Sequence, residues 1–219
     1  MSIYQKYPKR FFDIVLCAFA LIVLSPLFLI TAMAIKISSP GPVFYSSERA
    51  GLHKKPFRFY KFRSMHQTNN DKGMFVADAD RVFTVGKIIR RLKIDELPQL
   101  LNVVKGDMSI VGPRPMVASA VDQLYTGKYV KISDVRPGLT SAASLYDYTV
   151  GDTYTDDKVY IKEVLPVKLE MELYYVEHEN FLYDVQLVWR TIVTILKVLC
   201  KKKEFKPQPE YLKIKKYEH

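Results

Sequence analysis

The chain of 219 residues carries 33 lysines and arginines against 23 aspartates and glutamates, and its formal net charge is +10 at pH 7. This length suffices for one domain with a core of its own, and the charge indicates an anionic partner such as nucleic acid, acidic lipid or a phosphorylated substrate. Cys17 and Cys200 have neither metal-ligand nor disulfide spacing, and the four histidines are scattered, so a histidine-based metal site or catalytic triad has little support.

Residues 14–35 form an uncharged apolar run that is long enough to span a bilayer. Three interpretations compete: a signal peptide, a straight transmembrane helix and a re-entrant helical hairpin. A signal peptide would use the lysines and arginine at 6–10 as its basic region and 32–34 as its cleavage site. The apolar run is too long for a typical signal core, however, and Pro26 interrupts its middle. A straight transmembrane helix remains open.

Two features favour the hairpin. Ser25 and Pro26 fall at the centre of the run, and a proline there removes a backbone hydrogen bond and kinks the helix. Positive charge flanks both ends, at 6–10 and at Lys36, and would keep both flanks in the cytoplasm. We therefore expect residues 1–38 to enter the membrane, bend at Ser25 and Pro26, and return to the same face.

The next segments predict a small hairpin of strands. Residues 39–42, Ser-Pro-Gly-Pro, end the membrane segment. Residues 43–45 and 57–62 are rich in aromatic and β-branched residues and predict two strands, joined through 50–56. The polar residues 67–80 are expected to form a loop.

Lys61 and Arg63 are placed together on one side of the second strand by its two-residue period. Such a pair is either a solvated strand face or a two-cation clamp for phosphate. The sequence alone leaves both interpretations open.

A basic amphipathic helix is predicted from Val82 onward. Its apolar face is formed by Val85, Ile88, Ile89 and Leu92, and its basic face by Lys87, Arg90, Arg91 and Lys93. Such a helix suits an anionic membrane surface. It leads straight into Asp95 and Glu96, so we expect these two carboxylates to lie close to lipid headgroups.

Asp95 and Glu96 stand at the start of a short apolar helix. The missing N–H of Pro98 is harmless only in a first turn, so the helix should begin near Asp95 or Glu96. One buried stripe is formed by Leu97, Leu100, Leu101 and Val104. Gly106 supplies a left-handed stop. Asp95 would then lie where backbone N–H groups favour negative charge, as a phosphate site does. The alternative is an acidic N-cap on a core helix.

Arg114 lies between Pro113 and Pro115, which stiffen the backbone on both sides. A rigid backbone around one arginine suits bidentate capture of a phosphate or carboxylate, although a proline-stiffened surface turn would show the same pattern. Residues 135–140 predict a second turn of this type, and 146–160, rich in Tyr and Asp, predict a loop.

Two helices are predicted to close the fold, at 167–176 and 181–199. The second is strongly apolar but is interrupted by Asp184, Gln186, Arg190 and Lys197. Those charges disfavour a membrane crossing, whereas Trp189 and the lysines at 201–203 suit a helix lying in the membrane interface. The charged segment after Pro207 is expected to be peripheral.

Together these segments resemble the bacterial sugar transferase family, the monotopic phosphoglycosyl transferases, over residues 8–199. The matching segments are Lys9–Asp13, the Ser25-Pro26 break, Ser39–Phe44, Tyr60–Met65, Asp95–Leu100 and Lys105–Pro115. Each is weak alone, but all of them in this order are specific. The absence of a further transmembrane region upstream resembles the small, single-domain class of the family.

The resemblance implies a reaction. Members of the family transfer a sugar phosphate from a nucleotide diphosphosugar, usually a UDP-sugar, to polyprenyl (undecaprenyl) phosphate. The reaction takes place on the cytoplasmic leaflet of the bacterial inner membrane, releases UMP, and is the first membrane step of surface glycan synthesis. It uses Mg²⁺ and a covalent phospho-aspartate intermediate. The residues fit this chemistry, because an ionised carboxylate is a competent nucleophile and needs cations around it.

The motif match also implies roles for individual residues. Asp95 would be the nucleophile, and Glu96 would help it to hold the metal. Arg90 and Arg114 would neutralise the phosphates. Further candidates for substrate contacts are Lys61, Arg63 and Pro115.

The sequence departs from the family pattern in two places. After Pro137–Thr140, members commonly continue Gly-x-Ala-Gln-Val-Asn-Gly-Arg, where this chain has Ser141–Tyr148. This difference concerns sugar or nucleotide specificity rather than the chemistry. The acidic residue before Leu-Tyr-Tyr-Val is often Asp in the family and is Glu172 here.

We expect an α/β fold with more helix than strand: a cytoplasmic domain with a small β-hairpin, a re-entrant membrane helix hairpin and interfacial amphipathic helices. The expected divisions are an anchor at 1–38, a catalytic domain at 39–199 and a basic tail at 200–219. The expected partners are a nucleotide diphosphosugar, polyprenyl phosphate and anionic membrane lipids, and not nucleic acid. Apolar interfacial helices make a homodimer possible.

Two other functions are compatible with part of the pattern. A non-enzymatic, membrane-bound binder of anions would use the basic charge and the hairpin, but it would not need an acidic pair beside fixed arginines. An inactive scaffold for later glycosyltransferases would not need to retain Asp95, Glu96 and Arg114.

Overall fold

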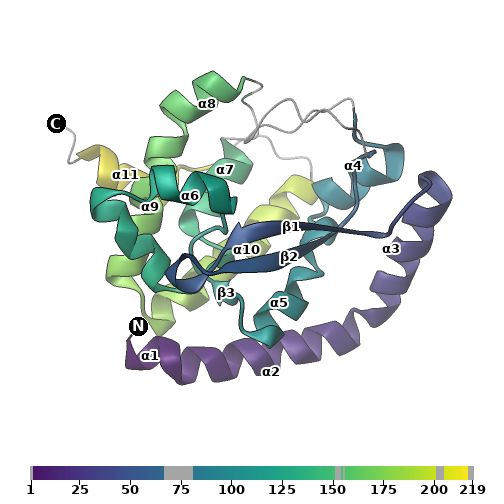
Figure 1. The fold of residues 1–219 in the computed structure, drawn as a ribbon, viewed down its shortest axis with the longest axis horizontal. Helices are drawn as coiled ribbons and strands as arrows, with labels where there is room; N and C mark the ends of the chain where they lie inside the picture. Colours follow the sequence, from purple (N-terminus) through teal and green to yellow (C-terminus); the bar gives the residue numbers. More distant parts are fainter. Residues whose placement is uncertain (1, 67–80, 151–153, 155, 201–204, 217–219) are drawn as a thin grey trace.

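The computed structural model of the chain describes residues 2–66, 81–150, 154, 156–200 and 205–216. Helices surround two small two-stranded sheets (Figure 1). The helix-rich α/β fold with a small β-hairpin is thus confirmed. The loop expected at 67–80 lies outside the described residues.

The N-terminal apolar run forms two helices that meet at a sharp bend. The short α1 (Ile3–Lys6) leads into α2 (Pro8–Val23), and α3 (Ser25–Ser38) follows at a bend of 60°. In the described part of the chain no single helix is long and apolar enough to cross a membrane. The two helices of this bent pair, taken together, meet that requirement by length and composition. In Figure 1, α2 runs along the lower edge of the molecule and α3 turns up its side. The predicted break at Ser25 and Pro26 is confirmed.

The predicted hairpin consists of β1 (Phe44–Ala50) and β2 (Pro56–Phe62). The strands are antiparallel, in register from Phe44 opposite Phe62 to Ala50 opposite Pro56. The first strand continues beyond its predicted end at 45, and the 3₁₀ turn η1 (Leu52–Lys54) joins the two strands.

A second, parallel pair of strands was not predicted. β3 (Ser109–Val111) pairs with β4 (Gly138–Thr140). The two backbones approach so closely that a Cβ atom at Gly138 would lie 2.1 Å from the backbone nitrogen of Gly112. Each strand has only three residues, too few for a two-residue period to show, and the prolines around them predicted stiff turns instead.

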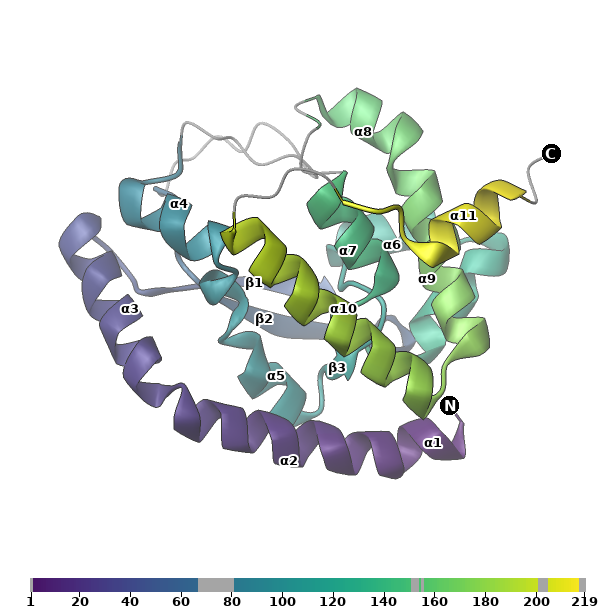
Figure 2. The same cartoon turned by 180° about the vertical axis from the view of Figure 1, so that it is seen from behind.

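The remaining helices enclose these strands. They are α4 (Thr84–Arg91), α5 (Gln99–Lys105), α6 (Ala118–Leu124), the 3₁₀ segment η4 (Gly127–Asp134), α7 (Ala142–Thr149), α8 (Asp157–Glu163), α9 (Leu165–His178), α10 (Phe181–Leu199) and α11 (Pro209–Lys216). The basic helix and both closing helices are confirmed. Seen from behind, α10 crosses the face of the molecule above α2 (Figure 2).

The loop predicted at 146–160 is wrong at 146–149, which belong to α7, and at 157–160, which belong to α8. Residues 142–149 form α7, because the side chain of Ser141 caps its first turn by accepting a hydrogen bond from the Ser144 N–H at 3.0 Å. Leu145 and Tyr146 then turn inward and are buried. The polar composition of this segment indicated a loop, but its N-terminal cap and its buried face stabilise a helix.

The end of the chain is not peripheral where it is described. In α11, Glu210 is buried and binds Arg190 of α10 at 2.9 Å and the hydroxyl of Tyr183 at 2.7 Å. Tyr211 stacks on Tyr146 with 5.3 Å between ring centroids. The lysines at 201–203 lie outside the described residues.

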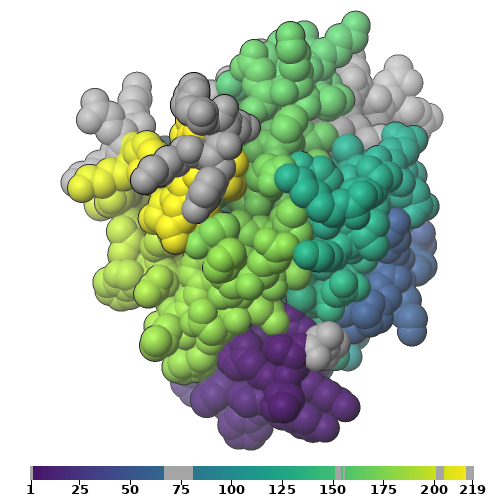
Figure 3. Space-filling model, turned by 90° about the vertical axis from the view of Figure 1, so that its left-hand side faces the viewer, coloured from purple at the N-terminus to yellow at the C-terminus, as the bar shows by residue number. Residues whose placement is uncertain are grey.

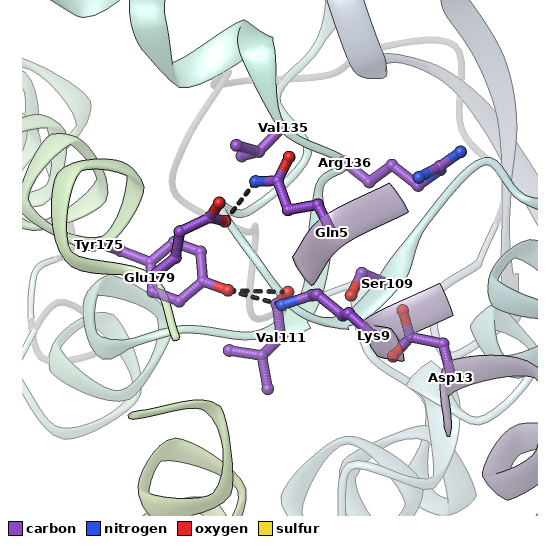
Figure 4. A pocket seen from close by; sticks show the side chains of 9 residues that line it. All are labelled: Gln5, Lys9, Asp13, Ser109, Val111, Val135, Arg136, Tyr175 and Glu179. Carbon is purple, nitrogen blue, oxygen red and sulfur yellow. Dashed lines mark hydrogen bonds between the residues drawn. The ribbon is translucent and has the colours of Figure 1, made fainter. Parts of the chain in front are cut away.

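A buried ion pair fixes the start of α2 to the C-terminal helices. The ammonium of Lys9 contacts the carboxylate of Asp184 and donates to the hydroxyl of Tyr175 at 2.7 Å. Figure 3 shows the purple start of the chain packed against the green segment that contains α9. In Figure 4, Lys9 points toward Tyr175, and Gln5 pairs with Glu179 beside it. The start of α2 is thus bound to α9 and α10 through charged and polar groups.

The same helix also contacts α5 and β3. Arg10 donates to the backbone oxygens of Val103 and Val104, the latter at 2.9 Å, at the end of α5. Asp13 accepts from the Ile110 N–H of β3 at 3.1 Å. Together with Lys9, these residues explain why the segment Lys9–Asp13 combines two bases and one acid.

Candidate active site

Asp95 and Glu96 lie in the 3₁₀ turn η3 (Ile94–Glu96), not at the start of an α-helix. Hydrogen bonds of the i to i+3 type continue through Leu97 to Leu100, and α5 begins only at Gln99. The expectation that a helix begins at Asp95 or Glu96 is therefore wrong by about one turn. Gly106 ends α5 with a φ of 101°, as predicted. The tight turn is entered through Lys93 at a φ of 55°, and the two adjacent carboxylates lie in different surroundings.

Glu96 is held by two cations. Its Oε1 atom lies 2.9 Å from the ammonium of Lys61 on β2 and 2.7 Å from the guanidinium of Arg114. Burial opposes ionisation of this carboxyl, but Arg114 and Lys61 hold its pKa well below the usual range. Glu96 is therefore ionised and fixed in place at neutral pH.

Asp95 is in the opposite situation. Its side chain is 7% exposed, and among the described residues its Oδ1 atom is buried with no hydrogen-bond partner. Burial raises the pKa of Asp95, the neighbouring Glu96 adds to this, and Lys61, Lys93 and Arg90 offset part of it. An acceptor that is buried beside cations but makes no hydrogen bond is suited to bind a ligand or to react.

The segment that carries Arg114 is rigid, as its prolines predicted. The Gly112 N–H donates to Thr140 O at 3.0 Å, and the Gly138 N–H donates to Pro113 O at 2.8 Å. The Arg114 N–H donates to Oε1 of Glu172 at 2.9 Å. Pro115 is buried behind this turn. The backbone of Arg114 is thus bound on both sides before its side chain reaches Glu96.

Glu172, from α9, is almost completely buried. Its Oε1 atom also accepts from the hydroxyl of Ser141 at 3.1 Å. Burial raises the pKa of Glu172 to about 7, although the N–H of Arg114 and the hydroxyl of Ser141 favour its charged form. The two departures from the family pattern, at Ser141 and Glu172, therefore lie in contact with each other, and sequence spacing gave no signal of this.

Lys61 and Arg63 do not form a clamp. Arg63 is buried, and its guanidinium donates to the backbone oxygens of Pro40 at 2.6 Å and Ser39 at 2.7 Å. It fixes the segment that leaves α3, and its own N–H donates to Val43 O at 2.8 Å, one residue beyond the end of β2 at Phe62. Only Lys61 faces the carboxylates.

Arg90 lies in the last turn of α4, half-buried, with its guanidinium 3.4 Å from the sulfur of Met65. The site therefore brings together Asp95, Glu96, Lys61, Arg90 and Arg114, and leaves Arg63 outside. The sequence analysis placed Lys93 on the basic face of the preceding helix but gave it no role at the site, where its charge also acts on Asp95.

A fully buried asparagine in α5, also missed, holds β2 in place. The Oδ1 atom of Asn102 accepts from the Tyr60 N–H at 3.2 Å, and its amide donates to Arg58 O at 2.7 Å. An asparagine among the apolar residues of this helix could have indicated such a role, because a buried amide requires hydrogen-bond partners.

An open cavity of about 240 Å³ adjoins Glu96 and Arg114. It lies between α5, α7 and α10, and most of its wall is apolar. A charged cluster at the edge of an apolar cavity suits an amphiphilic anion.

A sequence model described as the bacterial sugar transferase family matches residues 4–198. The chain belongs to this family. It is 42% identical over 196 residues to a UDP-N-acetylgalactosamine-undecaprenyl-phosphate N-acetylgalactosaminephosphotransferase of Aeromonas hydrophila, a match that covers 86% of this chain and 43% of that protein.

The alignments with two other relatives cover a larger share of those proteins. Sugar transferase EpsL of Bacillus subtilis is 37% identical over 188 residues, which cover 86% of this chain and 87% of EpsL. A UDP-glucose:undecaprenyl-phosphate glucose-1-phosphate transferase of Caulobacter vibrioides is 39% identical over 195 residues, covering 86% and 69% of the two proteins. The sugar transferase match extends across the bent helix pair, the turn with Asp95 and Glu96, and almost all of α10.

Proposed function

We propose that the protein transfers a sugar-1-phosphate from a UDP-sugar to undecaprenyl phosphate and so starts the synthesis of a surface polysaccharide. The family and the names of the Aeromonas and Caulobacter relatives support this reaction. The observation that carries it is the difference between two neighbouring carboxylates. Glu96 is bound by Lys61 and Arg114, while Oδ1 of Asp95 is buried without a partner among the described residues.

Asp95 is the nucleophile in this proposal. Its carboxylate attacks the β-phosphorus of the UDP-sugar, a new O–P bond forms, and the bond from that phosphorus to the bridging oxygen breaks, so that UMP leaves with the electron pair. An oxygen of undecaprenyl phosphate then attacks the same phosphorus and releases the Asp95 carboxylate. Neither step requires a proton from the protein. Lys61, Arg90 and Arg114 neutralise the phosphates that approach the carboxylates.

The residues fit a Mg²⁺ ion bound in one particular way. The described residues contain no cluster of three or more His, Cys, Asp or Glu side chains that could hold a metal. Mg²⁺, however, usually keeps several waters and is held by one or two carboxylates plus substrate phosphates. Asp95, with its unpartnered Oδ1, and Glu96 would hold it there, and it would supply further neutralisation of the diphosphate.

The proposed location is the cytoplasmic face of the bacterial inner membrane. The undecaprenyl acceptor requires membrane association, and the bent pair α2 and α3 is the one candidate anchor in the described part of the chain. We propose that this pair enters and leaves on the cytoplasmic side. Large apolar side chains exposed on α2 and α10, such as Phe19 and Trp189, suit contact with lipid.

The test is UMP release by detergent-solubilised protein from a panel of UDP-sugars, with undecaprenyl phosphate and Mg²⁺. We expect one sugar to give lipid-dependent release and Asp95→Asn to abolish it. Val159→Ala, on the outer surface of α8, is the matched control and should retain full turnover. Equal activity of Asp95→Asn and wild type would overturn the assignment of the nucleophile. No release from any nucleotide sugar would favour a non-enzymatic binder or scaffold.

A further inference from the structure

The cavity beside the catalytic carboxylates has charge at only one end. Lys93, Glu96 and Arg114 lie at that end. The rest of the wall is largely apolar and is formed by Leu97, Leu100, Ile110, Leu139, Leu145, Val188, Ile192 and Ile195. A ligand that matches this wall is an anion at one end and a hydrocarbon over the rest of its length.

The polar groups in the wall are already engaged with each other. The hydroxyls of Thr140 and Thr191 lie 2.6 Å apart, and Thr191 also bonds to the Leu187 carbonyl at 2.8 Å. Ser144 is bonded to Ser141 at 3.1 Å.

The hydroxyl of Tyr148, the remaining polar group of the wall, donates to the Arg91 carbonyl at 3.2 Å. A sugar or a uracil ring placed in this cavity would leave hydroxyls or amides without partners. Each such group would cost its full free energy of desolvation. A hydrocarbon requires no partners.

The outer wall of the cavity is shared with an exposed apolar stripe on α10. Ile192 lines the cavity and is 46% exposed, and Trp189, which directly follows the lining residue Val188, is 65% exposed. Val185 and Leu196 continue this stripe along the same helix face. A chain dissolved in lipid could therefore reach the cavity beside α10 without crossing water.

We propose that this cavity binds the first isoprene units of the polyprenyl acceptor, with the phosphate of that lipid held between Lys93 and Arg114. This inference rests on the proposed transferase function and assigns to its acceptor a site distinct from that of the UDP-sugar. In this proposal the apolar residues of α10 bind the hydrocarbon chain, and the phosphate transfer takes place at the end of the cavity near Glu96.

The test fills the cavity. Val188→Trp places a large ring into it from α10, and Val159→Trp makes the same exchange on exposed α8 as a control. Two half-reactions are measured separately: the burst of UMP released without any acceptor, and kcat/KM for acceptor phosphates of increasing length, from prenyl through farnesyl to undecaprenyl phosphate.

In the wild type and in Val159→Trp, kcat/KM should rise at least about tenfold from prenyl to farnesyl phosphate. In Val188→Trp this gain should be lost while the UMP burst stays unchanged. An intact burst also shows that the variant is folded, and Ile195→Phe provides a milder second filling if Val188→Trp gives no burst.

Three outcomes would overturn the proposal: no gain with chain length in the wild type, a gain that survives both fillings, or a loss of the UMP burst in Ile195→Phe, which would place the donor in the cavity. Failure of the transferase function itself is distinguishable, because then the wild type would give no burst from any nucleotide sugar.

Discussion

The backbone N–H of Arg114 donates to the buried carboxyl of Glu172 at 2.9 Å, while the guanidinium of the same residue reaches Glu96 at 2.7 Å. In the described part of the chain, the hydrogen bonds of Glu172 come from the Arg114 N–H and the Ser141 hydroxyl, and not from the turn that carries Asp95 and Glu96. Glu172 determines where Arg114 lies, and Arg114 in turn determines where Glu96 lies. The turn that carries Asp95 and Glu96 is therefore positioned from α9, a helix far along the chain.

Glu172→Ala should lower kcat by about tenfold to a hundredfold, because the Arg114 N–H and the Ser141 hydroxyl lose a shared buried acceptor, a loss of about 1–3 kcal/mol. Glu172→Gln keeps a carbonyl oxygen in the same place and should retain most of the activity. Steady-state UMP release from both variants checks this. A Gln variant as impaired as the Ala variant would show that the charge, and not the acceptor, matters.

The stability of the protein should depend on pH through Glu172. Burial raises its pKa from the ordinary value of 4.5 to about 7, so the neutral form is favoured in the folded state. This contribution is complete below pH 4.5 and is lost as pH rises through about 7, by roughly 3 kcal/mol in total.

The measurement is the free energy of unfolding across this range for wild type and Glu172→Gln. The difference between the two should change with pH, because the variant cannot ionise at this position. A difference that is constant from pH 4.5 to 8 would exclude a raised pKa.

Asp95→Asn and Glu96→Gln should have opposite effects on stability, although both remove one carboxylate. Asp95 is a buried charge without a hydrogen bond at Oδ1, so Asn should stabilise the metal-free protein by about 1 kcal/mol. Glu96 neutralises Lys61 and Arg114, so Gln should destabilise it by about 2 kcal/mol. Denaturant unfolding in one detergent, without Mg²⁺, compares the two. Equal effects of the same sign would contradict the division between the two carboxylates.

Removing only one partner of the buried pair Lys9 and Asp184 should lower the free energy of unfolding more than replacing both, because one partner alone is an uncompensated buried charge. Lys9→Met leaves Asp184 charged and buried, and should destabilise the protein by about 3–5 kcal/mol. The double variant Lys9→Met with Asp184→Leu should recover much of this loss, since two apolar groups replace two ions. A double-mutant cycle of unfolding free energies measures the coupling, and additive losses would contradict it.

The anchor is expected to leave both chain ends on one face of the membrane. Single cysteines placed at residue 2 and residue 219, in a variant without Cys17 and Cys200, should react with an impermeant reagent from the same side of sealed vesicles. Pro26→Ala restores a backbone donor at the bend and should shift part of the population toward labelling on opposite sides. Opposite labelling in the chain with Pro26 would show a straight span.

The long periodic segments were predictable from the sequence and the short, contact-dependent ones were not. The 181–199 helix and the break at Pro26 follow from apolar periodicity and from proline chemistry. The β3–β4 pair has too few residues to show a period, and α7 depends on the cap by Ser141. These elements are determined by partners that lie far away in the chain.

The site divides in the same way. Asp95, Glu96 and Arg114 were candidates because each stands in a short local motif, and the structure brings Glu96 and Arg114 into contact. The turn of Arg63 toward Ser39 and Pro40, and the contact of Ser141 with Glu172, required three-dimensional positions. A strand period predicts which side a residue takes only while the strand continues, and β2 ends one residue before Arg63.

Arg10 reaches from α2 to the last carbonyls of α5, and α5 follows directly from the turn that carries Asp95. The proposed anchor helix and the proposed nucleophile are therefore connected through α5 by direct hydrogen bonds. If α2 lies in the lipid as proposed, the height of this helix in the bilayer is also the height of Asp95. A membrane whose thickness shifts α2 would raise or lower the proposed nucleophile relative to the lipid phosphates, so the lipid composition of the host would change the reaction rate although the contacts of Asp95 stay the same.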